Sequence, residues 1–547
     1  MVLAGSKKLF PNWKNVLLAL LAAGLLVLAF PDFEWWWTAW FALVPLMWAV
    51  DREKESTVRS FVVGWIFGTT FFFGTCWWLT FAPITYAGFP WPLAYSLILI
   101  ATLGAGIFPA IFAAILSIFL RRFGSSAFIL APFIWVFSEF LRYWLTGNNW
   151  NAIGYSQACE PYCSVPTIWL IPSLWTAAIG GVLFTTGIIV FANALILRTL
   201  AANLRSGEIG KGFKKSVLEW VGVFVLSVAL SFLHAVTRLD DRRDKTWQTV
   251  VAIQPNVPMS GIGYSELEPL RQRQFDLAER EVRAIRNNRS KSDAGSPFQN
   301  ITVVLPESPM NYMYNDDLEF QRFVGDFARR NQVGVLFNSA EPDPTNGKYF
   351  NSAVLVGSDG REQTQYDKIF LLPFGEAVPR PLDSVVPGFV GNFSYGREYD
   401  ILQIGDAKAG VMICFESHFG QLGREYVRNG ADALIEMTND GYLGPTPVLR
   451  QHLANAIVRA VETNRPVLRV TNVGITAHIS PNGDICDSVV DCGLKPYTEG
   501  AMVMSFPKSD GSQTFYVRYG DWFAWLCTVV TLGIIGLCIV QRKTDES

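Results

Sequence analysis

The feature that most constrains this chain is a series of eight apolar stretches, each long enough to cross a lipid bilayer. A helix needs about 20 residues to span the hydrocarbon core of a membrane. The stretches lie near residues 14–30, 35–50, 59–82, 92–120, 126–145, 174–197, 216–236 and 521–541. Half of the 547 residues are hydrophobic and only 17% are charged, a composition typical of a membrane protein. We therefore predict a polytopic α-helical membrane domain with eight transmembrane helices.

The basic residues of the short connections predict on which side of the membrane each connection lies. They gather before the first span, in the second, fourth and sixth connections and after the last span, and are Lys7, Lys8, Lys14, Arg52, Lys54, Arg59, Arg121, Arg122, Arg198, Arg205, Lys211, Lys214, Lys215, Arg542 and Lys543. The first connection instead carries Asp32 and Glu34, and the third, residues 83–91, carries no charge. Because lysine and arginine are enriched in cytoplasmic loops, we expect both termini in the cytoplasm. The long seventh connection, residues 237–520, is then expected outside the cytoplasm.

Composition also argues against several classes of function. Lysine and arginine number 45 against 47 aspartates and glutamates, so no charge excess predicts a nucleic-acid partner. The chain has eight cysteines without a CxxC motif and only four histidines. This pattern predicts no metal site and no cofactor. Cys159 with Cys163, and Cys486 with Cys492, are close enough in sequence to form disulfides in an oxidising compartment, and free thiols fit equally well.

Two charged residues lie inside the fifth predicted span. Glu139 and Arg142, in IWVFSEFLRYWL, are three residues apart on one face of a helix and close enough to pair. Charges at membrane depth are costly unless they pair or face a cavity. The two residues therefore either tie helices together or line a pocket for a lipid headgroup, and the sequence leaves both interpretations open.

From Trp247 onward, short runs rich in β-branched residues alternate with amphipathic stretches. The runs include TVVAIQP, NITVVLPES, VGVLFNSA, SAVLVGSDG, AGVMICFES, ADALIEMTND and PVLRVTNVG, which are typical of strands buried on both faces. Residues 270–288, 317–332 and 448–464 have the pattern of helices. Strands covered by helices predict a layered α/β domain. The turn signal GSDGR at 357–361 adds antiparallel pairing, so we expect a mixed sheet.

Three of the predicted strands end next to chemically useful side chains. Glu307 follows VVLP, Lys368 lies in YDKIFLLPFGE with Glu376 eight positions later, and Cys414 ends GVMIC. Active sites favour the ends of buried strands. A carboxylate that takes the thiol proton and an ammonium that stabilises negative charge would make Cys414 a nucleophile. Taken singly, a buried core cysteine and solvated surface charges explain the same residues.

Longer motifs are spread in order along nearly the whole chain. They are FGTCWWL, SEFLRYWL, NAIGYSQ, IQPNV, VLPES, YDKIFLLPFGEAVP, ICFES, TNDGYLG, RQHLANAIVRAVETNRPVLRVTNVGITA and TFYVRYGDW. Together they resemble the nitrilase superfamily and, within it, the membrane-embedded branch of bacterial apolipoprotein N-acyltransferases. The resemblance implies an extracytoplasmic α/β nitrilase-like domain, an αββα sandwich, attached to the eight spans.

The resemblance also implies roles for individual residues. Glu307, Lys368 and Cys414 would be the catalytic triad, with Glu376 a second essential acid and Glu416 a supporting member of the catalytic set. Asn351 would hold a loop or orient the triad. The sequence departs from the family pattern at Phe415, where tyrosine is usual, and at Tyr442, where tryptophan is usual. Any role of a hydroxyl at position 415 therefore cannot be carried over.

The reaction implied by the resemblance is a two-step acyl transfer. Cys414 would take an acyl chain from a glycerophospholipid as a thioester and pass it to the α-amino group of the lipid-modified cysteine of an apolipoprotein. The thioester must then react with the amine in preference to water, so apolar side chains are expected around it. The predicted substrate-binding residues are Met310, Tyr312, Phe389, Phe393, Asn351, Phe415, Tyr442, Glu139 and Arg142. Gly388, Gly391 and Gly396 around the two phenylalanines suggest a mobile arm at the membrane interface.

We expect a monomeric protein of the bacterial inner membrane with a periplasmic catalytic domain. The predicted division is 1–237 for the first seven helices, 246–510 for the catalytic domain and 511–547 for the last helix and a cytoplasmic tail. Two other functions fit part of the pattern. One is a membrane-tethered amidase that uses the same triad, and the other is a transporter with a non-catalytic outer domain, for which the first half of the chain gives no inverted repeat.

Overall fold

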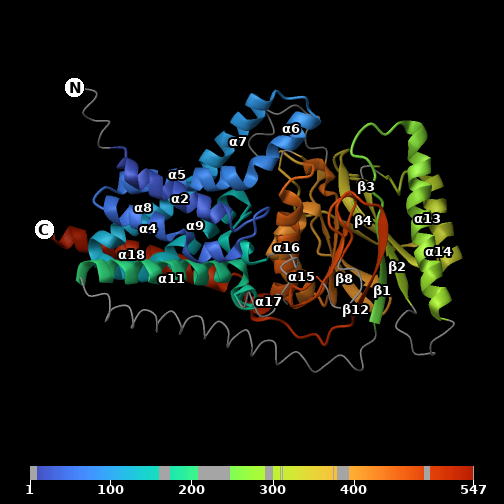
Figure 1. Cartoon of the computed structure of the whole chain (residues 1–547). Coiled ribbons are helices and arrows are strands. Elements are labelled where there is room, and N and C mark those ends of the chain that lie inside the picture. Colours follow the sequence, from blue (N-terminus) through green and yellow to red (C-terminus); the bar gives the residue numbers. More distant parts are fainter. Residues whose placement is uncertain are drawn as a thin grey trace.

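The protein consists of a bundle of apolar helices joined end-on to an α/β part (Figure 1). The computed structural model describes residues 9–158, 173–206, 247–289, 300–307, 310, 312–373, 375–378, 393–485 and 493–545. The seventh predicted span, residues 216–236, lies outside these ranges, and so do Phe389 and both predicted cysteine pairs.

Helices lie at each predicted span position that the structure describes. The main ones are α2 (Trp13–Val27), α3 (Ala39–Ala42), α4 (Val44–Glu53), α5 (Thr57–Cys76), α6 (Phe81–Thr85), α7 (Trp91–Ala105), α8 (Ile107–Phe123), α9 (Ala131–Thr146), α11 (Ala177–Ser206) and α18 (Trp522–Asp545). By length and composition, four described stretches suffice to cross a membrane: 57–85, 91–146, 174–200 and 522–540. The second of these is 56 residues long and contains α7, α8 and α9 in succession.

The bundle packs closely where small residues face one another. A Cβ added at Gly64 of α5 would lie 2.5 Å from the carbonyl oxygen of Pro109 and 2.7 Å from the Cβ of Ala113, both on α8. A Cβ at Gly68 would lie 2.9 Å from the Cα of Gly106. Glycine therefore lets the two backbones touch, which is how helices without a hydrophobic driving force associate in lipid.

The connections between helices meet at two opposite ends of the bundle. At the end far from the α/β part, Arg121 donates to the backbone carbonyl of Lys54 and, at 2.8 Å, to the hydroxyl of Thr57. At the other end, the Tyr86 hydroxyl donates to the carbonyl of Gly441 (3.2 Å) and Arg450 pairs with Glu34. The second and fourth connections thus lie together, and the first and third contact the α/β part.

Two sheets form the centre of the α/β part. The larger has the order β12-β1-β2-β3-β4-β5, with β6 beside β4, and the smaller has the order β11-β10-β9-β8-β7. The strands are β1 (Trp247–Gln254), β2 (Ile301–Val304), β3 (Gly334–Pro342), β4 (Tyr349–Val356), β5 (Glu362–Asp367), β6 (Phe393–Ser394), β7 (Ile401–Ile404), β8 (Ala407–Ile413), β9 (Ala433–Thr438), β10 (Val467–Thr471), β11 (Ala477–Ile479) and β12 (Gly500–Pro507). Both sheets mix parallel and antiparallel pairs, as predicted, and the turn at 357–361 joins antiparallel β4 and β5.

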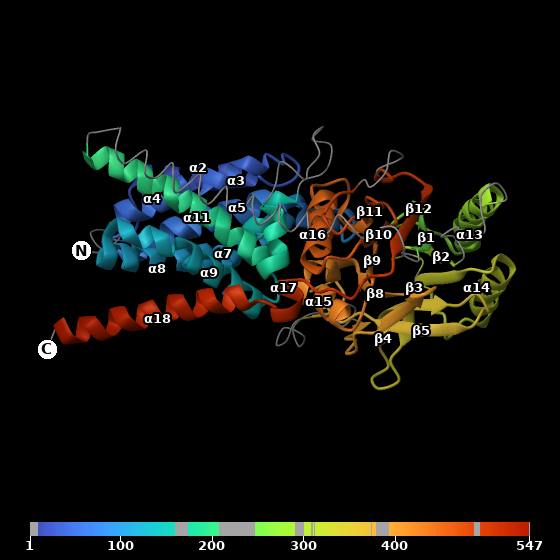
Figure 2. The same ribbon diagram turned by 90° about the horizontal axis from the view of Figure 1, so that it is seen from below.

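Helices cover both outer faces of the paired sheets (Figure 2). Helices α13 (Tyr264–Arg289) and α14 (Leu318–Asn331) pack on the larger sheet, and α15 (Gly420–Arg428) and α16 (Val448–Thr463) lie between the smaller sheet and the bundle. Alternate residues of the larger sheet enter different cores: Val251 and Val303 face α13 and α14, whereas Val250 and Val304 face the second sheet. This is the predicted αββα sandwich, and its α15–α16 layer contacts the helix bundle.

Candidate active site

The three residues of the predicted triad each follow a strand, and they lie close together between the two sheets. Glu307 follows β2, and Lys368 comes directly after β5, both in the larger sheet. Cys414 comes directly after β8 in the smaller sheet and begins a short 3-10 turn, Cys414–His418. Each side chain therefore leaves an ordered backbone at or just after the end of a strand.

Lys368 is the centre of a buried polar cluster. Its Nζ lies 2.8 Å from Oε1 of Glu376 and 3.9 Å from Oε1 of Glu307, and its side chain is 1% exposed. The Nδ2 of Asn351 donates to the same two carboxylates at 2.7 and 3.2 Å. The charges of Glu307 and Lys368 both act on the thiol of Cys414. The structure thus brings together five of the predicted residues and places Asn351 as the link between the two acids.

The surroundings set the protonation of this cluster. Burial raises the pKa of Glu307, and the charge of Lys368 opposes that rise. Burial alone would lower the pKa of Lys368, but Glu376 and Glu307 outweigh it and hold the pKa above its ordinary value. Burial and the Glu307 charge raise the pKa of the Cys414 thiol. The resting site therefore pairs a neutral thiol with a permanent cation and an adjacent carboxyl that can accept the thiol proton.

Glu416 holds the nucleophile turn in place and does not touch the reacting groups. It is fully buried, and its Oε1 accepts hydrogen bonds from the Tyr366 hydroxyl (2.8 Å) and from the backbone N–H groups of Ile369 (2.7 Å) and Phe370 (3.0 Å). Its Oε2 accepts from the N–H of Ile413 (2.8 Å). Burial raises the pKa of Glu416 to about 7. Predicted among the catalytic residues, Glu416 is placed as a positioning residue that ties the turn of Cys414 to the segment of Lys368.

Aromatic residues from both parts of the protein surround the site. Phe415 stacks on Trp150 of the helix bundle with ring centroids 6.2 Å apart and planes at 18°. Tyr442 is 44% exposed and meets the ring of Tyr86 edge-on at 6.5 Å. Phe415 and Tyr442 thus each contact an aromatic residue of the bundle, and their role as walls of the acyl pocket stays a prediction. Trp150 and Tyr86 were missed because both lie in connections that only the folded bundle brings to this place.

Other predicted wall residues lie elsewhere. Met310 and Tyr312 are buried in the core under α13 and α14, where Tyr312 stacks on Phe320 at 4.3 Å and Gln274 contacts both side chains. The prediction that these two residues line the acyl pocket is wrong, because they belong to the core on the opposite face of the larger sheet. Phe393 begins β6 beside β4, and its N–H donates to the carbonyl of Glu376 at 3.4 Å.

Glu139 and Arg142 do not pair with each other in the part of the chain that the structure describes. Oε1 of Glu139 accepts from the N–H of Ile153 (3.3 Å), and Arg142 donates to the carbonyl of Trp150 (2.9 Å) and lies over the ring of Phe72 (4.9 Å). Both side chains are 6% exposed. The predicted pair is therefore corrected: each charge fixes the 150–153 backbone, and through it Trp150.

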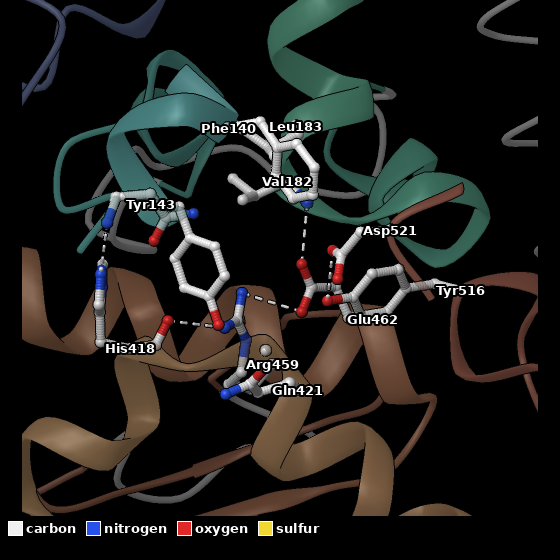
Figure 3. A pocket seen from close by; sticks show the side chains of 12 residues that line it. Phe140, Tyr143, Val182, Leu183, His418, Gln421, Arg459, Glu462, Tyr516 and Asp521 are labelled. Carbon is white, nitrogen blue, oxygen red and sulfur yellow. Dashed lines mark hydrogen bonds and ion pairs between the residues drawn. The ribbon is translucent and has the colours of Figure 1, made fainter. Parts of the chain in front are cut away.

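A separate small cavity lies at the junction of the bundle and the α/β part (Figure 3). Its lining includes Arg459 and Glu462 of α16, which form an ion pair at 2.9 Å. Glu462 also accepts from the N–H of Val182 (2.8 Å), just after α11 breaks at Gly180 and Gly181. The cavity contains no triad residue, so it marks the joint between the two parts and not the catalytic centre.

A second buried polar cluster, which sequence reasoning missed, lies behind Cys414. His452 of α16 contacts the carbonyl oxygen of Cys414 through Nε2 (3.0 Å) and Asp440 through Nδ1 (2.8 Å). Arg469 of β10 pairs with Asp440 (2.6 Å) and Glu436 (2.5 Å). The available signal was a run of polar residues on α16 that an apolar packing helix does not need. Among the described residues, no three His, Cys, Asp or Glu side chains are placed to share a metal ion.

Comparisons with known proteins agree with this arrangement. A family model described as the apolipoprotein N-acyltransferase N-terminal domain matches residues 22–195, and a carbon-nitrogen hydrolase model matches residues 300–502. The apolipoprotein N-acyltransferase of Geobacter metallireducens is 29% identical over 538 residues, covering 97% of this chain and 96% of the relative. Those of Haemophilus influenzae and Brucella suis are each 26% identical, covering 88% and 99% of this chain and 87% and 99% of the relative. The chain therefore belongs to the apolipoprotein N-acyltransferases, with a nitrilase-like carbon-nitrogen hydrolase domain after its first apolar helices.

Proposed function

We propose that the protein moves a fatty acyl chain from a glycerophospholipid to the N-terminal diacylglyceryl-cysteine of apolipoproteins through a thioester on Cys414. Its relatives along nearly the whole chain are named apolipoprotein N-acyltransferases, so it is a bacterial membrane enzyme that acylates lipoproteins. The donor and the chemical steps are our proposal. The observation that carries them is the buried Lys368, which lies 3.9 Å from Glu307 in a cluster whose charges act on the Cys414 thiol.

In the first half-reaction, Glu307 takes the proton of Cys414 and the sulfur attacks the carbonyl carbon of the phospholipid ester. The Lys368 ammonium stabilises the oxyanion of the tetrahedral intermediate. The ester C–O bond then breaks, Glu307 gives its proton to the leaving alkoxide, and a lysophospholipid departs. Glu376, 2.8 Å from Lys368, holds the ammonium in place during these steps.

In the second half-reaction, the free α-amino group of the apolipoprotein attacks the thioester carbonyl. Glu307 accepts the proton that the amine loses and returns it to the sulfur as the C–S bond breaks. An amide forms and Cys414 is regenerated as a thiol. Phe415, stacked on Trp150, and Tyr442, beside Tyr86, supply apolar surface near the sulfur, which favours the amine over water.

We further propose that eight helices cross the bacterial inner membrane, with both termini cytoplasmic and the catalytic domain periplasmic. The basic second and fourth connections lie together at the end of the bundle far from the catalytic domain, which supports this orientation under the positive-inside rule. The proposed division is 1–237, 246–510 and 511–547, and the protein is proposed to be a monomer.

An assay of transfer from phospholipid vesicles to a synthetic diacylated lipopeptide tests the proposal. We expect the whole chain to form the N-acylated lipopeptide and Cys414→Ser and Glu307→Gln to form none. Hydrolysis of small amides without transfer would favour a membrane-tethered amidase. Full transfer by Cys414→Ser would contradict the thioester. Neither transfer nor amide hydrolysis by the unaltered chain would leave the outer domain without a catalytic role, as in a transporter.

A further inference from the structure

The histidine behind the nucleophile, His452, has both ring nitrogens against hydrogen-bond acceptors. Nδ1 lies 2.8 Å from Oδ1 of Asp440, and Nε2 lies 3.0 Å from the carbonyl oxygen of Cys414 and 3.2 Å from Oε1 of Glu436. A neutral imidazole carries one N–H and one bare nitrogen, so it can satisfy only one side of this arrangement. A bare nitrogen facing a carbonyl or a carboxylate would be repelled.

Asp440 is held as an anion, so it cannot supply the missing proton. Burial raises its pKa, but Arg469 and His452 outweigh burial and bring the pKa down to about 2. The carbonyl of Cys414 has no proton to give. Both contacts of His452 therefore require the ring to donate, on Nδ1 and on Nε2.

The charges around His452 balance only if the ring carries a positive charge. The groups that face it are Asp440 from the 440–443 turn, Glu436 from β9, Arg469 from β10 through those two acids, and His418 from the nucleophile turn. Burial and Arg459 lower the pKa of His418, and its Nε2 accepts from the N–H of Asn149 (3.2 Å), so His418 is neutral. Two buried carboxylates and one arginine leave one negative charge uncompensated, and unpaired buried charge is costly.

The position of His452 matters because Cys414 has a strained backbone. Its φ is +53°, in the left-handed region that non-glycine residues rarely adopt. A hydrogen bond from Nε2 to the Cys414 carbonyl supports this conformation, and so does the bond from the preceding N–H of Ile413 to Glu416. Trp150, whose ring centroid is 6.0 Å from that of His452, adds an aromatic face that favours a cation.

We propose that His452 is a buried imidazolium that positions Cys414 and, by its charge, favours the thiolate that starts acyl transfer. It is a positioning residue, because it reaches the sulfur only through the Cys414 backbone and the local field. The inference deepens the proposed function and rests on it for its catalytic meaning. Its two physical claims, the ring charge and the effect on the thiol, are measurable without any acyl transfer.

The ring charge is tested by ¹⁵N NMR of histidine-labelled whole chain in nanodiscs at pH 7. The chain has four histidines, and a spectrum of His452→Gln identifies the His452 signals. We expect both ring nitrogens of His452 at the positions of N–H nitrogens, and one bare nitrogen for His418, which serves as an internal control. A bare ring nitrogen on His452 at pH 7 would overturn the proposal.

The effect on the thiol is tested by alkylating the folded protein with iodoacetamide from pH 6 to 10 and quantifying the Cys414 peptide by mass spectrometry. His452→Gln keeps a donor near the Cys414 carbonyl without the charge, and His452→Asn keeps only a donor near Asp440. We expect both variants to move the alkylation profile to higher pH by about one unit, so that Cys414 is alkylated about tenfold more slowly at pH 7. The asparagine variant should be alkylated more slowly than the glutamine variant. His478→Gln, in β11, is the matched control and should leave the profile unchanged.

An unchanged profile in folded His452→Gln would overturn the proposal. If the variants fail to fold, spectra of His234→Gln, His418→Gln and His478→Gln assign the other three histidines. The remaining signals of the unaltered chain then belong to His452 and still decide the ring charge. Failure of the proposed acyl transfer would appear differently, as a protein with the expected ring charge and thiol profile that forms no acylated lipopeptide.

Discussion

At the scale of single residues, the buried carboxyl groups of the site have different partners. Glu307 and Glu376 both lie beside Lys368, and Glu416 accepts hydrogen bonds from the backbone on both sides of the site. A carboxylate that accepts several backbone hydrogen bonds fixes geometry, because removing it leaves buried N–H groups without partners. Rigid support of this kind keeps a nucleophile and its cation at a working distance.

Replacing Glu416 tests this positioning role. Glu416→Gln leaves one oxygen and puts an NH₂ group against a buried N–H, so we expect a loss of about 1–3 kcal/mol in the free energy of unfolding and at least about a tenfold loss of transfer activity. Thermal unfolding and the lipopeptide assay measure the two effects. Glu425→Gln on α15, where Glu425 pairs at the surface with Arg428, should change stability by less than about 0.5 kcal/mol. Wild-type activity in Glu416→Gln would contradict the role.

The pH dependence of acylation tests Glu307 as the base. Glu307 accepts a proton only when ionised, so the rate of thioester formation should fall as pH drops through its raised pKa. The bond from Asn351 lowers that pKa, so Asn351→Leu should move the acidic limb of the profile to higher pH. The rate of single-turnover acylation between pH 5 and 9 gives the profile. The exposed Asn346→Ala serves as control, and an unmoved limb in Asn351→Leu would count against Glu307.

At the scale of helices and strands, close packing between α5 and α8 fixes the shape of the bundle. Gly64→Ala would place a Cβ 2.5 Å from a backbone oxygen of α8, so the helices must separate. We expect a loss of about 1–3 kcal/mol, read as a lower thermal unfolding temperature in detergent. Gly104→Ala on α7 meets nothing within 4 Å and should be neutral or slightly stabilising. Equal stability of the two variants would contradict the packing account.

Sequence patterns predicted the elements, and the strand ends that carry Glu307, Lys368 and Cys414, better than the surroundings of the site. Apolar runs such as GVMIC specify a buried strand, and its end places Cys414. Spacing alone could not reveal that Met310 and Tyr312 face the core, because one loop can turn toward either face of a sheet. Spacing also could not reveal that Glu139 and Arg142 bind the 150–153 backbone and do not pair with each other. That segment reaches the two side chains only in the folded bundle.

For the whole molecule, the account depends on the bundle holding the catalytic domain at one membrane surface. Three connections and α16 join the two parts, through Glu34 with Arg450, Tyr86 with Gly441, Asn149 with His418, and Glu462 with Val182. The bundle also supplies Trp150 to the aromatic wall. A domain cut free of the helices would lose that wall and its access to lipid.

The proposed orientation is tested by labelling single introduced cysteines in intact cells with a membrane-impermeant maleimide. Tyr264→Cys, at a residue 93% exposed on α13, should be labelled without lysis. Ser126→Cys, in the connection between α8 and α9, should be labelled only after lysis. Labelling is counted above that of the unaltered chain. The reverse pattern would place the catalytic domain in the cytoplasm.

The acyl-enzyme itself tests the central claim most directly. The purified whole chain is incubated with phospholipid vesicles, and its intact mass and its Cys414 peptide are measured before and after addition of the lipopeptide. We predict the added mass of one fatty acyl chain, located on Cys414, that disappears as N-acylated lipopeptide forms. An active enzyme whose Cys414 never carries an acyl chain during turnover would contradict the account.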